Sequence, residues 1–157
     1  MTKTVGLGTD KRTIIEGINK VVVSYVNDDI LSVLRLGTTG TTAFKISSHS
    51  KLKLPVNCPF HKLSGNLLRE LQTRFSHVRL MIMDMVSMMG KMIYYIDQRL
   101  RQISGQANVP FGGDLVIFVG DFQQLPPVRD KAMYEEESGD SFTLFDSFSE
   151  VVELVDT

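Results

Sequence analysis

The chain has 157 residues, of which 43% are hydrophobic and 22% charged, and its formal net charge is −1. This composition is typical of one soluble globular domain and excludes a disordered or fibrous chain. A motor with two ATPase lobes does not fit this length, at roughly 100–200 residues per domain, and the near-zero charge gives no global sign of nucleic-acid binding.

The first third of the chain predicts one helix, one strand and one loop. Apolar residues at helical spacing predict a helix over 11–26. An apolar run of strand length spans 30–36, and a Gly/Thr loop follows at 37–42. The stretch 47–62 is polar, and its two prolines predict irregular structure.

Two helices and two buried strands follow. Ser64 is placed to N-cap a helix over about 65–76. Its apolar face would carry Leu67, Leu68, Leu71 and Phe75. Residues 78–83 predict a buried strand ending at Asp84, and 91–104 predict a helix. A second buried strand is expected at 115–119.

The tail predicts a short helix near 145–149 and a strand at 151–155. Strands that alternate with helices indicate an α/β fold, with a mainly parallel sheet covered on both faces. Ligands of such sheets bind at the carboxyl ends of the strands. Polar signals fall at three of these ends: 37–42, Asp84 and Gly120-Asp121.

The first chemical motif is the glycine-containing segment from Gly6 to Arg12. A phosphate loop reads G-x-x-x-x-G-K-[ST], and its backbone N–H groups and helix N-terminus hold phosphate. Lys11 occupies the lysine position. Val5 and Asp10 stand at the two glycine positions, and Arg12 stands where a magnesium-binding hydroxyl belongs. By itself the segment favours a glycine turn into a helix over a nucleotide site.

Asp84 ends an apolar strand, the usual arrangement of an ATPase carboxylate that holds Mg²⁺ through water. Residue types alone leave a metal ligand and a strand-end turn residue equally open. Met85 stands where a water-polarising Glu would be expected, and loss of a general base costs roughly 10²–10⁴ in rate. Six of the eight methionines lie between Met81 and Met92, a pattern that favours core filling over metal binding.

The third motif is the string GDFQQLPPV, which starts at Gly120. A buried strand ends in a glycine turn that presents Asp121 and then Gln124, before two prolines stiffen the chain. A glutamine in this place can hydrogen-bond a terminal phosphate and report its loss. As an intact string this motif is specific enough to identify a family.

GDFQQLPPV, together with LMIMDMVSMMGK and LSGNLLRELQTRF upstream, resembles the Pif family of superfamily-one DNA helicases, including those of Helitron transposons. YIDQRLRQI and the Pro110 to Gly113 string belong to the same likeness, which runs from about Val5 to the C-terminus. The resemblance implies a RecA-like ATPase lobe and a nuclear protein. It also implies ATP hydrolysis coupled to DNA unwinding, in repair, recombination and telomere maintenance.

Site residues carry over position by position. The resemblance places the phosphate loop at Gly6, Gly8, Thr9 and Lys11. It implies that Asp84 binds the Mg²⁺ that accompanies ATP and that Gln124 senses phosphate. It implies that single-stranded DNA, alone or at a fork, is contacted by Thr39, Gly40, His49 and Ser50.

The departures from the family pattern lie in the same motifs. Asp10 and Arg12 alter the phosphate loop, Met85 replaces the catalytic Glu, and Thr38 replaces a proline. The resemblance also stops just before the arginine-containing motif that opens the second lobe, and the strand before the phosphate loop is reduced to about Thr2 to Val5, so residues 1–157 are expected to be a single lobe, incomplete at both ends and without the second helicase lobe. Such a chain would have little activity.

Three functions stay open. The chain is an ATP-dependent DNA helicase lobe by lineage, or a non-catalytic transposon remnant that binds nucleotide or single-stranded DNA weakly. A different P-loop protein, such as a small kinase, lacks a supporting base-recognition signature.

Other residues carry weaker signals. No apolar run reaches the roughly 18–20 residues that span a bilayer, and no signal peptide is recognisable, so no membrane partner is expected. Cys58 is the only cysteine, so a reducing compartment, either cytosol or nucleus, is favoured. Cys58 shares no metal-ligand spacing with the histidines. Solubilising charge is favoured over a phosphate track for five basic residues: Lys45, Lys51, Lys53, Arg69 and Arg74.

Overall fold

The computed structural model describes residues 2–5, 13, 16–18, 20–21, 33–36, 51–55, 58–84, 86–121, 126–127 and 130–153. Its five-stranded sheet has the order β2-β3-β4-β1-β5. The strands are β1 (Thr2–Val5), β2 (Val33–Leu36), β3 (Leu80–Asp84), β4 (Leu115–Gly120) and β5 (Glu150–Glu153). All four pairings between these strands are parallel, so the predicted α/β fold with a parallel sheet is confirmed.

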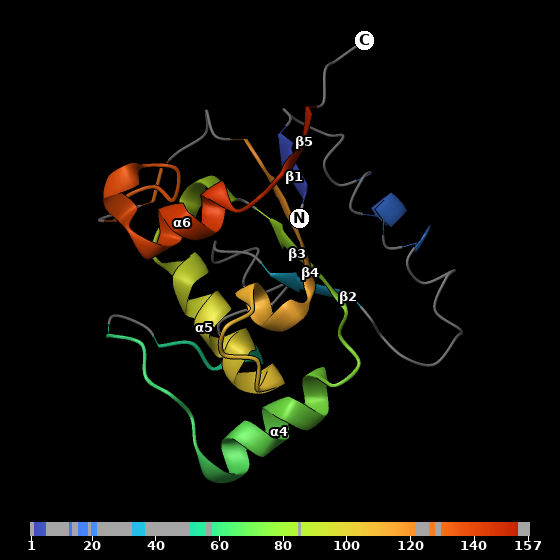
Figure 1. The fold of residues 1–157 in the computed structure, drawn as a ribbon. Coiled ribbons are helices and arrows are strands. Elements are labelled where there is room, and N and C mark those ends of the chain that lie inside the picture. The colour runs from blue at the N-terminus through green and yellow to red at the C-terminus, as the bar shows by residue number, and fades with distance from the viewer. Residues whose placement is uncertain are drawn as a thin grey trace.

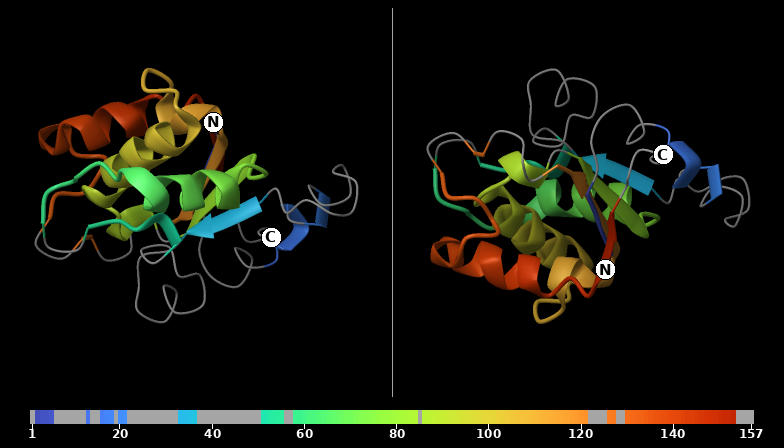
Figure 2. Two further views of the ribbon diagram at one scale, coloured as in Figure 1. Left: turned by 90° about the horizontal axis from the view of Figure 1, so that it is seen from below. Right: turned by 90° about the horizontal axis from the view of Figure 1, so that it is seen from above.

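Helices cover both faces of the sheet. Three of them, α4 (Gly65–Phe75), α5 (Met92–Ser104) and α6 (Asp140–Asp146), lie together on one side (Figure 1). Short 3-10 turns occur at η1 (Val86–Met88), η2 (Pro110–Gly113) and η3 (Glu136–Ser138). Residues 13, 16–18 and 20–21 are helical and lie on the other side, as Figure 2 shows from two further directions.

Strand β3 is the centre of the core because it is buried on both faces. Its methionines Met81 and Met83 are fully buried and join the large apolar cluster beneath α4 and α5. Alternate residues Leu80 and Ile82 join a smaller cluster on the opposite face, against which Ile18 packs. This period of two is the pattern of a strand buried on both faces, and it confirms that these methionines fill the core.

The string PFGG forms η2, the turn that leads from α5 into β4. Phe111 and Gly112 both have left-handed backbone angles, with φ of 51° and 66°. A Cβ on Gly112 would lie 2.4 Å from Ser104 Oγ and 2.7 Å from the Leu100 carbonyl oxygen, so only glycine fits against α5 here. The ring of Phe111 packs edge-on against those of Phe118 and Phe148, with centroids 6.4 and 6.2 Å away.

The structure corrects three local predictions. Ser64 occupies the N-cap of α4, but its side chain makes no capping hydrogen bond. Leu67 is 37% exposed, and the buried residues of that helix are Leu71 and Phe75. The helix expected near 145–149 is α6, which begins earlier because Gly139, with φ of 62°, turns the chain just before it. The rest of the predicted 11–26 helix, and the start of the 30–36 strand, lie outside the described residues.

Candidate nucleotide site at the carboxyl edge of the sheet

Three strand ends carry the predicted nucleotide chemistry, and the register of the sheet brings them to one edge. Val5, the last residue of β1, pairs with Gly120 at the end of β4. Asp84, the last residue of β3, pairs with Val119 of the same β4. Because β4 lies between β1 and β3, Val5, Gly120 and Asp84 lie side by side at this edge. Carboxyl ends of parallel strands are where such sheets bind ligands.

Gly120 permits a close approach at this edge. A Cβ at this position would lie 2.6 Å from Val86 Cγ2 and 3.0 Å from the Val86 backbone nitrogen. The end of β4 therefore packs directly on η1, the turn that follows Asp84. The glycine before the aspartate of GDFQQ thus has a packing reason, and it lies within strand β4 rather than in the glycine turn that the sequence predicted.

The edge presents two carboxylates. Asp84 is half-buried at the tip of β3, and Asp121 is only 3% exposed just beyond β4. Carboxylate oxygens are hard donors, and Mg²⁺ is usually held by one or two of them together with water and substrate phosphates. The donor set of this edge therefore fits Mg²⁺ with a nucleotide. Within the described part of the chain, no three His, Cys, Asp or Glu side chains cluster as a self-sufficient metal site.

Most predicted site residues lie outside the described residues. These are Gly6, Gly8, Thr9 and Lys11 of the phosphate loop, Thr39, Gly40, His49 and Ser50 of the DNA-contact segment, and Gln124 with Met85. Asp84 is the one predicted site residue that the described part contains. The roles of all these residues stay predictions.

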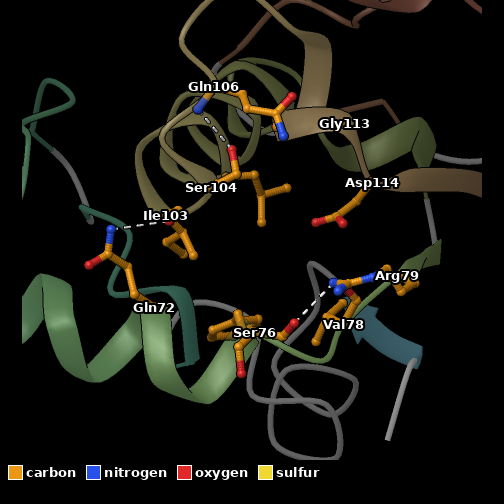
Figure 3. Close-up of a pocket in the computed structure, with 12 residues that line it drawn as sticks. Gln72, Ser76, Val78, Arg79, Ile103, Ser104, Gln106, Gly113 and Asp114 are labelled. Carbon is orange, nitrogen blue, oxygen red and sulfur yellow. Dashed lines mark hydrogen bonds between the residues drawn. The ribbon is translucent and has the colours of Figure 1, made fainter. Parts of the chain in front are cut away.

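Another cavity lies at the opposite, amino edge of the sheet, beneath the ends of α4 and α5 (Figure 3). Its volume is about 350 Å³. Arg79 lines it and donates hydrogen bonds to the carbonyls of Ser76 and Val78, while Gln72 donates to the Ile103 carbonyl. These polar groups bond neighbouring backbone and are remote from the nucleotide edge, so the cavity does not extend the candidate site.

Asp114 faces this cavity and has an unusual titration. Partial burial raises the pKa of its carboxyl, and the charge of Arg79 partly offsets that rise. Because its pKa is raised, the folded state binds the proton of this carboxyl more tightly than the unfolded state does. Protonation therefore stabilises the fold fully below the unfolded pKa, and this contribution is lost as the pH rises through the folded pKa. Asp114→Asn is therefore expected to raise the Tm at pH 7, and to leave it nearly unchanged at pH 2.5, where the carboxyl is protonated in both states.

The measurement is thermal unfolding followed by circular dichroism across this pH range. The exposed Glu135→Gln substitution is the matched control, because it also removes one carboxylate. A difference between Asp114→Asn and wild type that is the same at both pH values would contradict the assignment.

Three charged residues with structural roles were not singled out by the sequence: Asp97, Arg99 and Asp130. The first two are buried on α5, with exposed fractions of 1% and 0%. Asp130 accepts hydrogen bonds from the backbone N–H groups of Lys91 and Lys131. The sequence did contain one signal of their burial. Asp97 and Arg99 lie among the apolar residues of α5, whereas charged residues are mostly exposed.

Within the described residues, no helix is long and apolar enough to cross a membrane. The two described histidines of the central segment, His61 and His77, are exposed, as is Cys58. None of them belongs to a metal-binding group among the described residues.

Comparison with known proteins identifies this arrangement. A family model described as PIF1-like helicase matches residues 5–154. The ATP-dependent DNA helicase RRM3 of Saccharomyces cerevisiae is 27% identical over 131 residues, which are 79% of this chain and 18% of that protein. The ATP-dependent DNA helicase Pif1 of Bdellovibrio bacteriovorus is 40% identical over 60 residues, which are 38% of this chain and 14% of the relative.

Solved structures show the same fold. A Pif1 helicase double mutant from Bacteroides superposes with a TM-score of 0.71 at 26% identity, over 99% of this chain and 38% of that one. The Pif1 helicase of Candida albicans gives a TM-score of 0.72 at 22% identity, over 98% and 35% of the two chains. The present chain thus spans less than two fifths of each of these relatives. The shared part has the fold of a RecA-like helicase domain.

Proposed function

We propose that the chain binds ATP with Mg²⁺ at the carboxyl edge of its sheet and contacts single-stranded DNA, because it belongs to the PIF1-like helicase family. A structure of the family bound to single-stranded DNA and another with ADP-AlF3 are among those that resemble this chain. The observation that carries the proposal is the strand register, which aligns Asp84, Gly120 and the residue before the glycine loop.

Each predicted residue has a distinct role in this proposal. The backbone N–H groups of Gly6, Gly8 and Thr9 cradle the phosphates, and Lys11 neutralises their charge. Asp84 orients Mg²⁺ through water. Gln124 hydrogen-bonds the terminal phosphate.

The DNA contact is a separate part of the proposal. Thr39, Gly40, His49 and Ser50 grip the sugar-phosphate backbone, which carries no sequence information. Family membership supports a further part of the proposal, which is action in the nucleus on single-stranded DNA or forks during repair, recombination and telomere maintenance.

A second candidate function is nucleotide and DNA binding without catalysis. Asp10 puts a carboxylate beside the phosphates, Arg12 offers no hydroxyl to Mg²⁺, and Met85 cannot accept a proton. Loss of a general base alone lowers a rate roughly 10²–10⁴-fold. We propose that the wild-type chain descends from a helicase and now binds nucleotide and single-stranded DNA weakly without catalysis.

The proposal is tested by thermal shift with magnesium-ATP and by ATP turnover with and without single-stranded DNA. A ligand that binds only the folded state raises stability by RT ln(1 + [L]/Kd), so weak binding gives a measurable shift at millimolar ATP. We expect a shift that Lys11→Ala removes and that Lys62→Ala, an exposed lysine elsewhere, preserves. We expect no DNA-stimulated turnover.

Each half of the proposal has an outcome that contradicts it. DNA-stimulated turnover that Lys11→Ala abolishes would show that the chain is catalytic without a Glu at position 85. Absence of both a nucleotide shift and single-stranded DNA binding would overturn the proposed binding function.

A further inference from the structure

Helix α5 carries a fully buried arginine that holds a distant part of the chain. The side chain of Arg99 is 0% exposed. One of its terminal nitrogens, Nη2, donates hydrogen bonds to the backbone carbonyls of Lys53 and His61, each at 3.1 Å. These two carbonyls lie 46 and 38 residues before Arg99 in the sequence. The arginine therefore ties both ends of the 53–61 segment to α5.

Neighbouring side chains complete this attachment. Gln102, one turn further along α5, accepts a hydrogen bond from Arg99 and another from the Leu63 backbone N–H, and it donates to the Leu63 carbonyl. The Arg99 guanidinium carbon lies 4.8 Å from the centroid of the Phe60 ring, a cation–π arrangement. We call Arg99 and Gln102 the α5 clamp.

The energetics of Arg99 do not suit a residue that serves stability alone. No carboxylate pairs with it among the described residues, its Nε has no hydrogen-bond partner there, and burial lowers its pKa. A buried charge without a counter-charge is expensive, and apolar replacements of buried ionic groups are often neutral or stabilising. An apolar side chain, however, cannot donate hydrogen bonds to two backbone carbonyls, as the planar guanidinium group does.

The clamped segment is continuous with the predicted DNA-contact residues. Lys51 follows Ser50 directly, and Lys53 is two residues further. Lys53 has φ of 50°, an uncommon left-handed conformation for a residue with a side chain. Its carbonyl is one of the two that Arg99 holds, so the clamp fixes the chain at a strained bend just after the DNA-contact segment.

The other end of α5 is anchored near the nucleotide edge. The backbone N–H of Lys91, the N-cap residue, donates to Asp130 Oδ2 at 2.7 Å. Gly90 lies against the same carboxylate, where a Cβ would come within 2.4 Å of it. Asp130 follows the GDFQQLPPV string, and Gly90 follows η1 and Asp84. Helix α5, about 20 Å long at 1.5 Å per residue, thus joins the two regions.

We propose that Arg99 is a positioning residue for single-stranded DNA binding, because it fixes the chain that leaves the DNA-contact segment against α5. This inference rests on the proposed function, since it assumes that the segment ending at Ser50 contacts DNA. Arg99 itself is fully buried and touches no ligand. Its effect is transmitted through the carbonyls of Lys53 and His61.

The test compares Arg99→Lys, which keeps the charge and loses the fork, with Arg101→Lys in the full chain. Arg101 lies two residues away and bonds Asp97 and the Ala107 carbonyl, so it holds a different part of the chain. Oligo-dT binding is measured by fluorescence anisotropy, nucleotide binding with a fluorescent ATP analogue, and backbone order by hydrogen exchange of peptides spanning Lys51 to Leu63.

We expect Arg99→Lys to raise the Kd for oligo-dT about tenfold, which corresponds to about 1.4 kcal/mol. Its nucleotide Kd should stay within about twofold of wild type, and hydrogen exchange between Lys51 and Leu63 should accelerate. Arg101→Lys should bind oligo-dT like wild type. A merely structural role would lower the Tm without separating the two affinities.

Two results overturn the inference, and they are distinguishable. Faster exchange between Lys51 and Leu63 with unchanged oligo-dT affinity overturns the role of Arg99 alone. Absence of oligo-dT binding by the wild-type chain overturns the proposed DNA contact as well. If Arg99→Lys does not fold, Gln102→Ala decides the question by the same criteria, because it removes the bonds to Leu63 and the acceptor of Arg99 Nη1 and keeps the side chain of Arg99.

Discussion

A chain carrying Asp10→Gly, Arg12→Ser and Met85→Glu together is expected to bind magnesium-ATP at least about tenfold more tightly than wild type. In the proposed phosphate loop, Asp10 would place a negative charge next to the phosphates and a Cβ where such a loop takes a positive φ, at a cost of about 1 kcal/mol or more. Serine at position 12 supplies the hydroxyl that Mg²⁺ lacks in the wild-type loop. A tenfold gain requires about 1.4 kcal/mol, so removal of the charge and the strain suffices.

The measurement is a titration with a fluorescent ATP analogue, at fixed Mg²⁺ and in the presence of EDTA. Two further variants are built on the triple substitution. Lys11→Ala should abolish the gain, and Asp84→Asn should remove its dependence on Mg²⁺. An unchanged Kd in the triple variant would show that the segment from Gly6 to Arg12 is a turn into a helix and holds no phosphate.

Asp97→Ala is expected to destabilise the fold by about 3 kcal/mol, the largest stability effect that the described contacts predict. Asp97 is 1% exposed, and its Oδ1 accepts the backbone N–H of buried Phe111 at 2.7 Å. Its Oδ2 accepts from Arg101 Nε at 2.7 Å. Removal of the carboxylate leaves a buried N–H without a partner at the left-handed turn η2, and it leaves Arg101 without its ion pair.

This loss corresponds to a Tm lower by about 6–12 °C, at 2–4 °C per kcal/mol for a chain of this size. Asp97→Asn keeps an oxygen for the Phe111 N–H and should lose about half as much. Asp146→Ala, an exposed aspartate at the end of α6, is the matched control and should change the Tm by less than about 2 °C. A loss below about 1 kcal/mol for Asp97→Ala would mean that η2 keeps its shape without the carboxylate.

Periodicity predicted the elements of the sheet well where the apolar pattern was unambiguous. Strands β3 and β4 and helix α5 were expected within two residues of their observed ends. The exception was α6, for which the sequence predicted a helix near 145–149, too far along the chain. The positive φ of Gly139 and the C-cap at Ser147 set its actual limits, and these depend on local backbone geometry rather than on apolar spacing.

Some residues of the candidate site and its surroundings could be predicted from the sequence, and others could not. Asp84 and the Gly120-Asp121 pair were predicted at strand ends because an apolar run stops at each of them, and the structure places both at the carboxyl edge. The α5 clamp and Asp97 were not predicted. Their partners are backbone groups 14 to 46 residues away, and a backbone carbonyl or N–H leaves no signature in the sequence.

The sequence by itself determined the family of this protein and the positions at which it departs from the family pattern. Intact strings such as GDFQQLPPV identify its family, and Asp10, Arg12 and Met85 are departures from the predicted ATP motifs, because side-chain identity is read directly from the chain. Only the tertiary structure decided that β4 lies between β1 and β3. Strands pair through backbone hydrogen bonds, so the sequence of a strand does not specify which strand lies beside it. For the same reason only the structure could show that a buried arginine on α5 holds the chain beyond Ser50.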